Sequence, residues 1–245
     1  MDTISAIAAS GMRARMQELD ILANNLANSS SSGYKSDKEV YSTYSVNAAS
    51  NDPEATGKSP WVKGTWVDFT QGTIAPTGNP LDVALSGKGF LSVRGAAGPL
   101  YTRNGSLKVT SKGELVAAED RAVLDSGGKP VKIDPKLPYE INSKGEVMQE
   151  GKTVAKLGVV EFANPNALAK VGQSYFQSTG LGNTPKPAVA TEIHQGQLEG
   201  SNAGPAEAAV RLVSVMRQFE MLQKTVTISS DMDKQAFEEV AKVTG

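Results

Sequence analysis

Both ends of the chain carry hydrophobic residues at helical spacing, whereas the middle carries the short runs typical of β-strands. Near the C-terminus the apolar positions are separated alternately by three and four residues, and they are Leu212, Val215, Phe219, Leu222 and Val226. This spacing is the a/d seam of a coiled coil and predicts a helix that packs against another helix. Near the N-terminus one helical face holds Ile4, Ala8, Met12, Leu19, Leu22 and Leu26. The two stripes favour a subunit built to assemble.

The N-terminal pattern predicts a helix over residues 3–28. The helix is expected to end at Asn28, before a run of four serines and Gly33, because serine competes for backbone hydrogen bonds and glycine accepts a positive φ. The face opposite the apolar stripe is predicted to be polar, and it carries Arg13, Arg15, Gln17 and Glu18.

The C-terminal pattern predicts a helix from Pro205 to about Val243, because proline suits the first helical position. Its 39 residues would span about 58 Å. A helix of that length exceeds what the central domain could cover, so part of its stripe is expected to face something else. The seam is interrupted at Ser229 and Asp233, and it resumes with Ala236, Val240 and Val243.

The central residues predict a mainly β domain of short antiparallel strands, arranged as a sandwich or a barrel. Trp66 and Phe69 are expected to point into its core. A hairpin is predicted at Asn104 and Gly105, because this pair favours a type I′ turn. Residues 154–162 are expected to form one strand that is buried on both faces.

These patterns divide the chain into five segments. Residues 1–35 contain the N-terminal helix, 61–180 form the β-rich body, and 205–245 form the C-terminal helix. Residues 36–60 and 181–204 are predicted to be linkers, because they are rich in Ser, Asn, Asp, Gly and Pro and show little periodicity. The two helical segments are interpreted as assembly segments that form a coiled-coil-like structure on assembly.

Composition narrows the classes of function. The chain has 245 residues, of which 25 are basic and 26 acidic, and its net charge is −1. It has no basic stripe that could neutralise phosphates, so nucleic-acid binding is not expected. The absence of cysteine excludes disulfides and cysteine-bound metals. No apolar run reaches the roughly 18 residues of a membrane span, and the N-terminus does not resemble a Sec signal.

Candidate catalytic residues do not form a recognisable group. His194 is the only histidine and has no triad partner in its polar surroundings. Ser86 to Gly89 lacks the glycine and hydroxyl residue that a phosphate loop requires. Glu119 and Asp120 could in principle serve as a glycosidase pair, but adjacent carboxylates in a turn are common. No catalytic residue, metal, cofactor or small-molecule substrate is therefore predicted.

Several longer strings carry a family resemblance. Residues 23–28, followed by Gly33, Tyr34 and Lys35, resemble the N-terminal signature of flagellar basal-body rod and hook proteins. Residues 77–90, 101–105 and 195–202 resemble the start of their β domain, its continuation and the approach to their C-terminal helix. The motif residues are Asn24, Asn25, Leu26, Asn28, Gly33, Tyr34, Leu81, Asp82, Gly87, Gly89, Phe90, Leu198, Glu199, Ser201 and Asn202. The length and the run Arg-Gln-Phe-Glu-Met at residues 217–221 resemble the proximal-rod type most.

The resemblance implies a structural subunit, not an enzyme, that builds the axial shaft of the bacterial flagellum across the periplasm. It implies export by the flagellar type III apparatus without a cleaved signal, and helical polymerisation with copies of itself and other rod and hook proteins. Membrane insertion is not implied. The residues expected at the assembly interface are Met12, Leu19, Leu22, Leu26, Leu212, Val215, Phe219, Leu222 and Val226.

Other functions stay open at this stage. A distal-rod or hook-type subunit of the same family is the nearest alternative. A cell-wall hydrolase that uses carboxylates of the β domain is a second, since a rod must pass the cell wall. A capping or chaperone-like module, whose helices bind a different partner, is a third.

Overall fold

The computed structural model describes residues 3–47, 56–180 and 182–243, and the chain divides into two compact units. One unit, the helical unit, contains Met1–Ala27, Asp37–Trp66 and Gly204–Gly245. The other, the β-body, contains Asn28–Ser36 and Val67–Ala203. The long terminal helices that the sequence predicts are present, and they share one unit.

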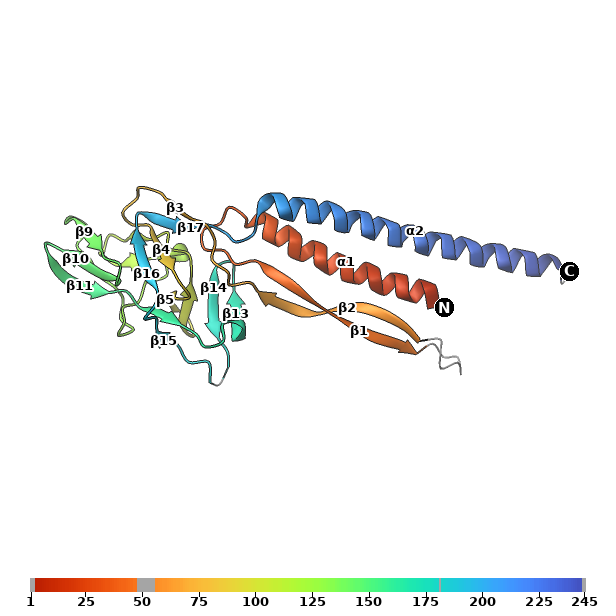
Figure 1. Ribbon diagram of the computed structural model, residues 1–245, viewed down its shortest axis with the longest axis horizontal. Coiled ribbons are helices and arrows are strands. Elements are labelled where there is room, and N and C mark those ends of the chain that lie inside the picture. The colour runs from red at the N-terminus through yellow and green to blue at the C-terminus, as the bar shows by residue number, and fades with distance from the viewer. Residues whose placement is uncertain (1–2, 48–55, 181, 244–245) are drawn as a thin grey trace. The chain divides into compact units, whose positions relative to one another are not determined.

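The helical unit is built on two antiparallel helices, α1 (Thr3–Ala27) and α2 (Pro205–Val243) (Figure 1). Glu18 of α1 pairs with Arg211 of α2, whereas Gly11, earlier in α1, lies against Leu222, later in α2. A Cβ atom built on Gly11 would lie 3.3 Å from Leu222 Cδ1. The helices approach closely at this point because glycine has no side chain.

A two-stranded ribbon completes the helical unit, and it consists of β1 (Asp37–Asn47) and β2 (Thr56–Val67). Residues 36–60 were predicted to be a linker, and the structure has β1 and the start of β2 there. The β-branched and aromatic residues of 40–46 favour a strand. Trp66 was expected to point into the core, and this is wrong. Its exposed fraction is 39%, and the Lys38 ammonium lies 5.6 Å from the centroid of its ring.

The β-body contains many short strands and two short 3₁₀ turns (η1 and η2). Its elements are β3 (Ile74–Pro76), β4 (Val83–Ser86), β5 (Phe90–Gly95), β6 (Gly98–Thr102), β7 (Lys108–Val109), β8 (Leu115–Val116), η1 (Ala118–Asp120), β9 (Tyr139–Ile141), β10 (Glu146–Gln149), β11 (Lys152–Lys156), β12 (Val159–Glu161), η2 (Pro165–Ala167), β13 (Leu168–Val171), β14 (Tyr175–Ser178), β15 (Lys186–Pro187), β16 (Glu192–Gln195) and β17 (Gln197–Glu199).

These strands form several small antiparallel sheets. The largest has six strands in the order β13-β14-β6-β5-β12-β15, and another has the order β11-β10-β9. The remaining pairs are β16-β4, β17-β3 and β7-β8. The predicted sandwich or barrel is therefore wrong. Strands of two to six residues change partners too often to build two continuous facing sheets or one closed sheet.

Two local predictions also fail. Asn104 and Gly105 do not close a hairpin, because β6 pairs with β5 and β14, whereas β7 pairs with β8. A Cβ atom on Gly105 would lie 1.7 Å from the Val83 carbonyl oxygen, so this glycine permits a close backbone approach instead. Residues 154–162 are not one strand, because β11 and β12 belong to different sheets and Val154 is exposed.

The β-body holds two hydrophobic clusters. The larger is mostly aliphatic and draws on most of the sheets, with Val83, Leu91, Val93 and Val123 fully buried. The smaller is mostly aromatic and is formed by Phe90, Tyr101, Phe162, Leu168 and Phe176. Phe69 packs against the second cluster, with its ring centroid 5.0 Å from that of Phe176, as its predicted inward position requires.

Candidate functional site

The nine predicted interface residues all lie on α1 or α2. Leu22 and Val215 are buried, with exposed fractions of 4% and 3%. The other seven are half-buried, and they are Met12, Leu19, Leu26, Leu212, Phe219, Leu222 and Val226. The side chains of Ile4, Asp233, Ala236, Val240 and Val243 lie outside the described residues. The seam residues are thus at least half covered within a single chain, where α1 and α2 pack against each other.

Helix α2 carries a second apolar stripe that its own chain leaves exposed. Its members are Val210, Val213, Met216, Met221, Ile228 and Met232. Their exposed fractions run from 46% at Met216 to 73% at Val210. A groove on this stripe, the α2 groove, is lined by Ala209, Val210, Val213, Ser214, Arg217, Gln218 and Met221. Large apolar side chains gathered on one helical face are typical of a protein-binding surface.

A buried carboxylate ties the three parts of the helical unit together. Glu18, which is 3% exposed, accepts a hydrogen bond from the Tyr41 hydroxyl of β1 at 2.6 Å. It also accepts one from Arg211 Nη2 of α2 at 3.0 Å, and Arg15 pairs with it from the preceding turn of α1. Arg211 in turn pairs with Glu39 of β1. Burial, followed by the hydrogen bond to Glu18, raises the pKa of Tyr41.

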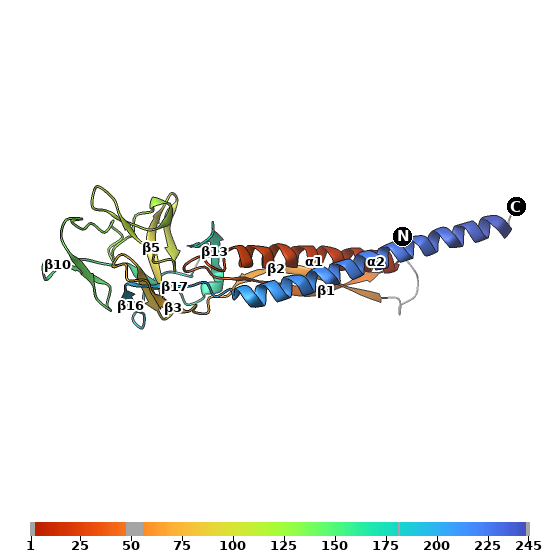
Figure 2. The same ribbon diagram turned by 90° about the horizontal axis from the view of Figure 1, so that it is seen from above.

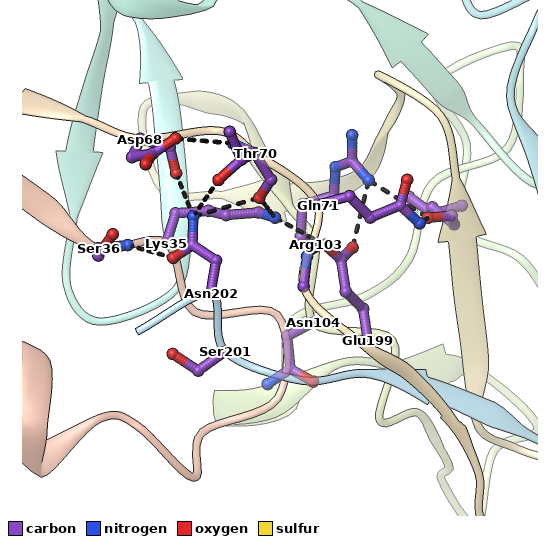
Figure 3. A network of polar contacts seen from close by, with 12 residues as sticks. Lys35, Ser36, Asp68, Thr70, Gln71, Arg103, Asn104, Glu199, Ser201 and Asn202 are labelled. Carbon is purple, nitrogen blue, oxygen red and sulfur yellow. Dashed lines mark hydrogen bonds and ion pairs between the residues drawn. The ribbon is translucent and has the colours of Figure 1, made fainter. Parts of the chain in front are cut away.

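A second buried carboxylate lies within the β-body, where Glu199 binds two cations (Figure 3). Lys35 Nζ lies 2.6 Å from Glu199 Oε1, and Arg103 Nη1 lies 3.2 Å from Oε2. The three side chains are at most 2% exposed. Lys35 also donates to the Thr70 carbonyl at 2.7 Å, and the Gly72 amide donates to Glu199 Oε1 at 2.9 Å.

Arg103 contacts backbone and an aromatic ring as well as Glu199. Its guanidinium donates to the carbonyl oxygens of Leu85 and Gly87 as well as to Glu199. The guanidinium carbon also lies 5.1 Å from the centroid of the Phe90 ring. Burial lowers the pKa of both Lys35 and Arg103, and the negative charge of Glu199 partly offsets this effect. Two cations that share one buried carboxylate make Glu199 the residue on which the cluster depends.

Backbone contacts around the cluster join the segment that follows α1 to the segment that precedes α2. The Gly33 amide donates to the Glu199 carbonyl at 2.7 Å. Asn202 accepts a hydrogen bond from the Ser36 amide at 2.8 Å and donates to the Asp68 carbonyl at 2.7 Å. Gly33 has a φ of +66°, and a Cβ atom there would lie 2.3 Å from the backbone of Arg103, so only glycine fits.

The structure brings several motif residues together and leaves others apart. Gly33, Glu199 and Asn202 meet at the cluster, with Phe90 beneath Arg103. Tyr34 is fully buried, and Lys170 Nζ lies 4.2 Å from its ring centroid. Gly87 also lies at the cluster, since its carbonyl accepts a hydrogen bond from Arg103. Leu198 and Ser201 are the chain neighbours of Glu199 and Asn202, and the remaining motif residues are Asn24, Asn25, Leu26, Asn28, Leu81, Asp82 and Gly89.

Two of these more distant motif residues have evident structural tasks. Asn25, in α1, donates to the Asp37 carbonyl at 2.8 Å and accepts from the Asp37 amide at 2.9 Å, so it fixes the start of β1. Gly89 leaves room for Val159, since a Cβ atom there would lie 2.7 Å from Val159 Cγ1. Both examples hold backbone in place.

Sequence reasoning missed the charged members of both networks. It placed Glu18 on the polar face of α1, and it did not name Lys35, Arg103, Tyr41 or Arg211 as site residues. One signal for Glu18 was available, because it lies at three- and four-residue spacings from buried positions of α1, which are Ala8, Gly11, Ala14, Leu22 and Asn25. Lys35 and Arg103 stand within the family motif strings at 33–35 and 101–105, which was the available signal. No local pattern shows that both pair with Glu199, because Glu199 lies far from them in the sequence.

Tests for other site types give no positive result within the described parts of the chain. No group of three or more His, Asp or Glu residues there could hold a metal ion. Of the helices described, neither combines the length and the hydropathy that a membrane crossing requires. His194 lies 4.0 Å from Glu192, at the surface of the β-body.

Comparison with known proteins identifies the family. A model of the flagella basal body rod protein matches residues 6–35, a model of the flagellar hook protein FlgE/F/G D1 domain matches 84–149, and a model of the flagellar basal body rod FlgEFG protein C-terminal region matches 194–238. The flagellar basal-body rod protein FlgF of Caulobacter vibrioides is 32% identical over 248 aligned residues, which cover 99% of this chain and 100% of that protein.

The chain belongs to the flagellar basal-body rod protein family. FlgF of Mesorhizobium japonicum is 28% identical, over 92% of this chain and 93% of that protein. FlgG of Agrobacterium fabrum is also 28% identical, over 93% of this chain and 95% of that protein. The resemblance read from the sequence motifs is confirmed, including its similarity to the FlgF type. The three family matches include α1 with Lys35, Arg103 of the β-body, and Glu199 with most of α2.

Proposed function

We propose that this chain is a structural subunit of the flagellar rod that assembles through its helical unit. Its relatives are named basal-body rod proteins, and the chain is a structural protein of the flagellar basal body rather than an enzyme. Rod proteins of this family assemble with other flagellar components. The finer proposal is that α1 and α2 form the coiled-coil-like assembly segment and line the shaft across the periplasm.

The observation that carries the proposal is that α2 has two apolar stripes. One contains seam residues such as Val215 and Leu222 and lies toward α1 in the same chain. The other contains Val210, Val213 and Met221 and stays exposed. Water disfavours an exposed apolar stripe of this size, so it favours contact with a neighbouring subunit. The nine predicted interface residues would then stabilise the packing of α1 against α2 within each subunit.

The experiment is incorporation of variants into basal bodies in cells that lack the native copy of this protein. Val213→Asp combined with Met221→Asp places two charges on the exposed stripe, and we expect the chain to fold but to be absent from purified basal bodies. Gln223→Asp combined with Thr227→Asp is the matched control, because both residues are exposed on α2 but lie outside the α2 groove. Normal incorporation of the first variant would overturn the proposal.

Leu222→Asp is a less specific test of the same idea. Leu222 packs against Gly11 in the same chain, so a charge there is expected to separate α1 from α2 before any assembly step. Loss of incorporation by this variant would therefore follow from misfolding as well as from a lost contact. The variant with Val213→Asp and Met221→Asp separates these two causes, because it changes only exposed residues.

We further propose that the flagellar type III apparatus exports the chain without removing a signal. Family membership supports this route, and so does the helical character of the N-terminal segment, since α1 needs other parts of the helical unit to bury its apolar face. Deletion of residues 1–35 should stop secretion in a flagellar export assay. The control is a chain that carries Gly11→Leu, which we expect to be secreted because export does not require the packed helices.

A further inference from the structure

The two helices of the helical unit differ in length, and α2 continues beyond the N-terminal end of α1 in both views (Figures 1 and 2). Gly11 lies level with Leu222, and Thr3 comes eight residues earlier in an antiparallel partner. Thr3 is therefore level with about residue 230 at equal rise per residue. We call residues 231–243 the α2 overhang, because α1 of the same chain does not reach them.

Beyond the interruption at Asp233, the α2 overhang again carries apolar residues at the spacing of the seam, and they are Ala236, Val240 and Val243. Met232, which belongs to the exposed stripe of α2, is 64% exposed. A helix end with this pattern needs a partner, because isolated helices in water gain little stability from their own sequence. The partner of the preceding seam is α1, which ends too early to continue the contact.

The α2 groove has the dimensions to receive this end. It runs from Ala209 to Met221, a span of 13 residues, and the overhang at 231–243 also has 13 residues. Each segment is about 20 Å long. The exposed Val210, Val213 and Met221 give the groove an apolar floor of the kind that a helix with a matching stripe covers.

The charges of the two segments are opposite. Arg217 is the charged residue among those that line the groove, which gives the lining a charge of +1. Arg211 of the same stretch is paired with Glu18 and Glu39 of its own chain. Residues 231–243 contain four acidic residues and two lysines, which gives a net charge of −2. Contact between two overhangs would bring like charges together, as would contact between two grooves. Contact between an overhang and a groove brings opposite charges together.

We infer that the α2 overhang of one copy binds the α2 groove of a second copy. This inference rests on the proposed function and names the partner of the exposed stripe. The contact joins two different surfaces, so each bound copy still has a free groove or a free overhang, and the chain of contacts stays open. If the two α2 helices run parallel and Met232 of one copy lies level with Val210 of the other, the copies are displaced along the helix axis by about 33 Å.

Engineered cysteines test the pairing directly, because the chain contains none. Ser214→Cys places a thiol in the groove, and Gln235→Cys places one on the overhang. Both positions are exposed, so the fold should be unchanged, as circular dichroism would check. The two purified full-length variants are made with different tags, mixed and oxidised. We expect the mixed disulfide to exceed the statistical share, with little product from either variant alone.

Charge variants sharpen the same assay. Arg217→Glu in the groove copy should reduce the mixed product, and Glu238→Arg in the overhang copy should restore it. Added salt should weaken the wild-type contact, because exposed charges are screened. Ser126→Cys in the β-body is the matched control, since it is exposed but lies outside both segments.

Two results would overturn the inference. One is disulfide formation by Gln235→Cys alone that equals the mixed product, which would mean a symmetric contact between overhangs. The other is a mixed product no greater than that of the Ser126→Cys control. The proposed function has its own test, since normal incorporation of the Val213→Asp and Met221→Asp chain would overturn it whatever the disulfides show.

Discussion

The helical unit and the β-body differ sharply in how much apolar side chain they leave exposed. Among the described residues, ten of the twelve exposed large hydrophobic side chains belong to the helical unit. The two in the β-body are Val154 and Val189. Both hydrophobic clusters lie in the β-body. The β-body therefore completes its core alone, whereas the helical unit leaves large apolar side chains exposed to solvent.

The two units also use a buried carboxylate in different ways. Glu199 of the β-body holds two cations that are both nearly inaccessible to solvent. Glu18 of the helical unit is equally buried, but its partners Arg15 and Arg211 remain partly exposed, with side-chain values of 30% and 44%. Removing a charged partner lowers the free energy of unfolding more in a cluster that excludes water than in one that water can reach. The variants below test this contrast.

Glu199→Gln is expected to have the largest effect. It removes the carboxylate that pairs with both Lys35 and Arg103 in the buried cluster, so we expect the free energy of unfolding of the β-body to fall by about 3–5 kcal/mol. Hydrogen exchange reports on this unit at the amides of Ser92 and Leu124, which donate to the carbonyls of Gly158 and Ser92. Both tryptophans lie in β2, so tryptophan fluorescence reports separately on the helical unit.

Two further variants complete this test. Lys35→Met leaves Arg103 paired with Glu199, so it should lower the free energy of unfolding less than Glu199→Gln does. Glu140→Gln is the matched control, because Glu140 is exposed in the same unit and should leave exchange unchanged. A loss as large for Lys35→Met as for Glu199→Gln would show that Glu199 is not the centre of the cluster.

Gly11→Leu is expected to have a smaller effect, confined to the helical unit. The new side chain must enter space that Leu222 already occupies, and overpacking of this kind costs about 1–3 kcal/mol. Urea unfolding followed by the helical signal in circular dichroism measures the loss. Ala23→Leu, on an exposed position of α1, is the control, and it should be close to neutral. Equal effects of the two changes would mean that the helices do not pack closely at Gly11.

The helices show what sequence pattern can predict. A periodic apolar stripe is a local signal, and it predicted α2 with the bounds that the structure has, Pro205–Val243. The motif strings predicted the family for a related reason, since each is contiguous in the chain. In both cases neighbouring residues carry the information.

The β-body shows where the pattern fails. Asn104 and Gly105 favour a hairpin locally, yet Gly105 faces the backbone of Val83, which is distant in sequence. In the local sequence, charged residues such as Lys35, Arg103 and Glu199 look like surface residues. Only the fold brings these three together. Trp66 shows the opposite error, since a large aromatic residue was expected inside but covers the surface of the ribbon. Pairing between distant segments decides each of these outcomes.

Titration of two tyrosines is expected to give the smallest effect and the finest comparison of the units. Burial is the main cause that raises the pKa of Tyr41 in the helical unit, and the hydrogen bond to Glu18 adds to it. Burial also raises the pKa of Tyr175 in the β-body, to about 12, and its hydroxyl donates to the Ala118 carbonyl. Burial is thus the main cause for both tyrosines, and Tyr41 differs in that its hydroxyl is also hydrogen-bonded to a carboxylate.

The sign of the effect on stability follows from these directions. Because the folded-state pKa of each tyrosine lies above its unfolded value of about 10, its contribution to stability is complete below pH 10 and is lost as the pH rises further. Tyr41 is 41% exposed, so solvent screening limits its contribution. We expect Tyr41→Phe to lower the free energy of unfolding by no more than about 1 kcal/mol at neutral pH.

Carbon-13 labelling of the tyrosine rings allows each titration to be followed by NMR, with Tyr41→Phe and Tyr175→Phe used to assign the signals. Glu18→Gln should lower the midpoint of Tyr41, because it removes the negative charge beside the hydroxyl, and should leave that of Tyr175 in place. A shift of both midpoints would mean that the two units respond to Glu18 together. An unchanged midpoint for Tyr41 would mean that burial alone raises its pKa. The charge of Glu18 would then have no effect on the ionisation of Tyr41.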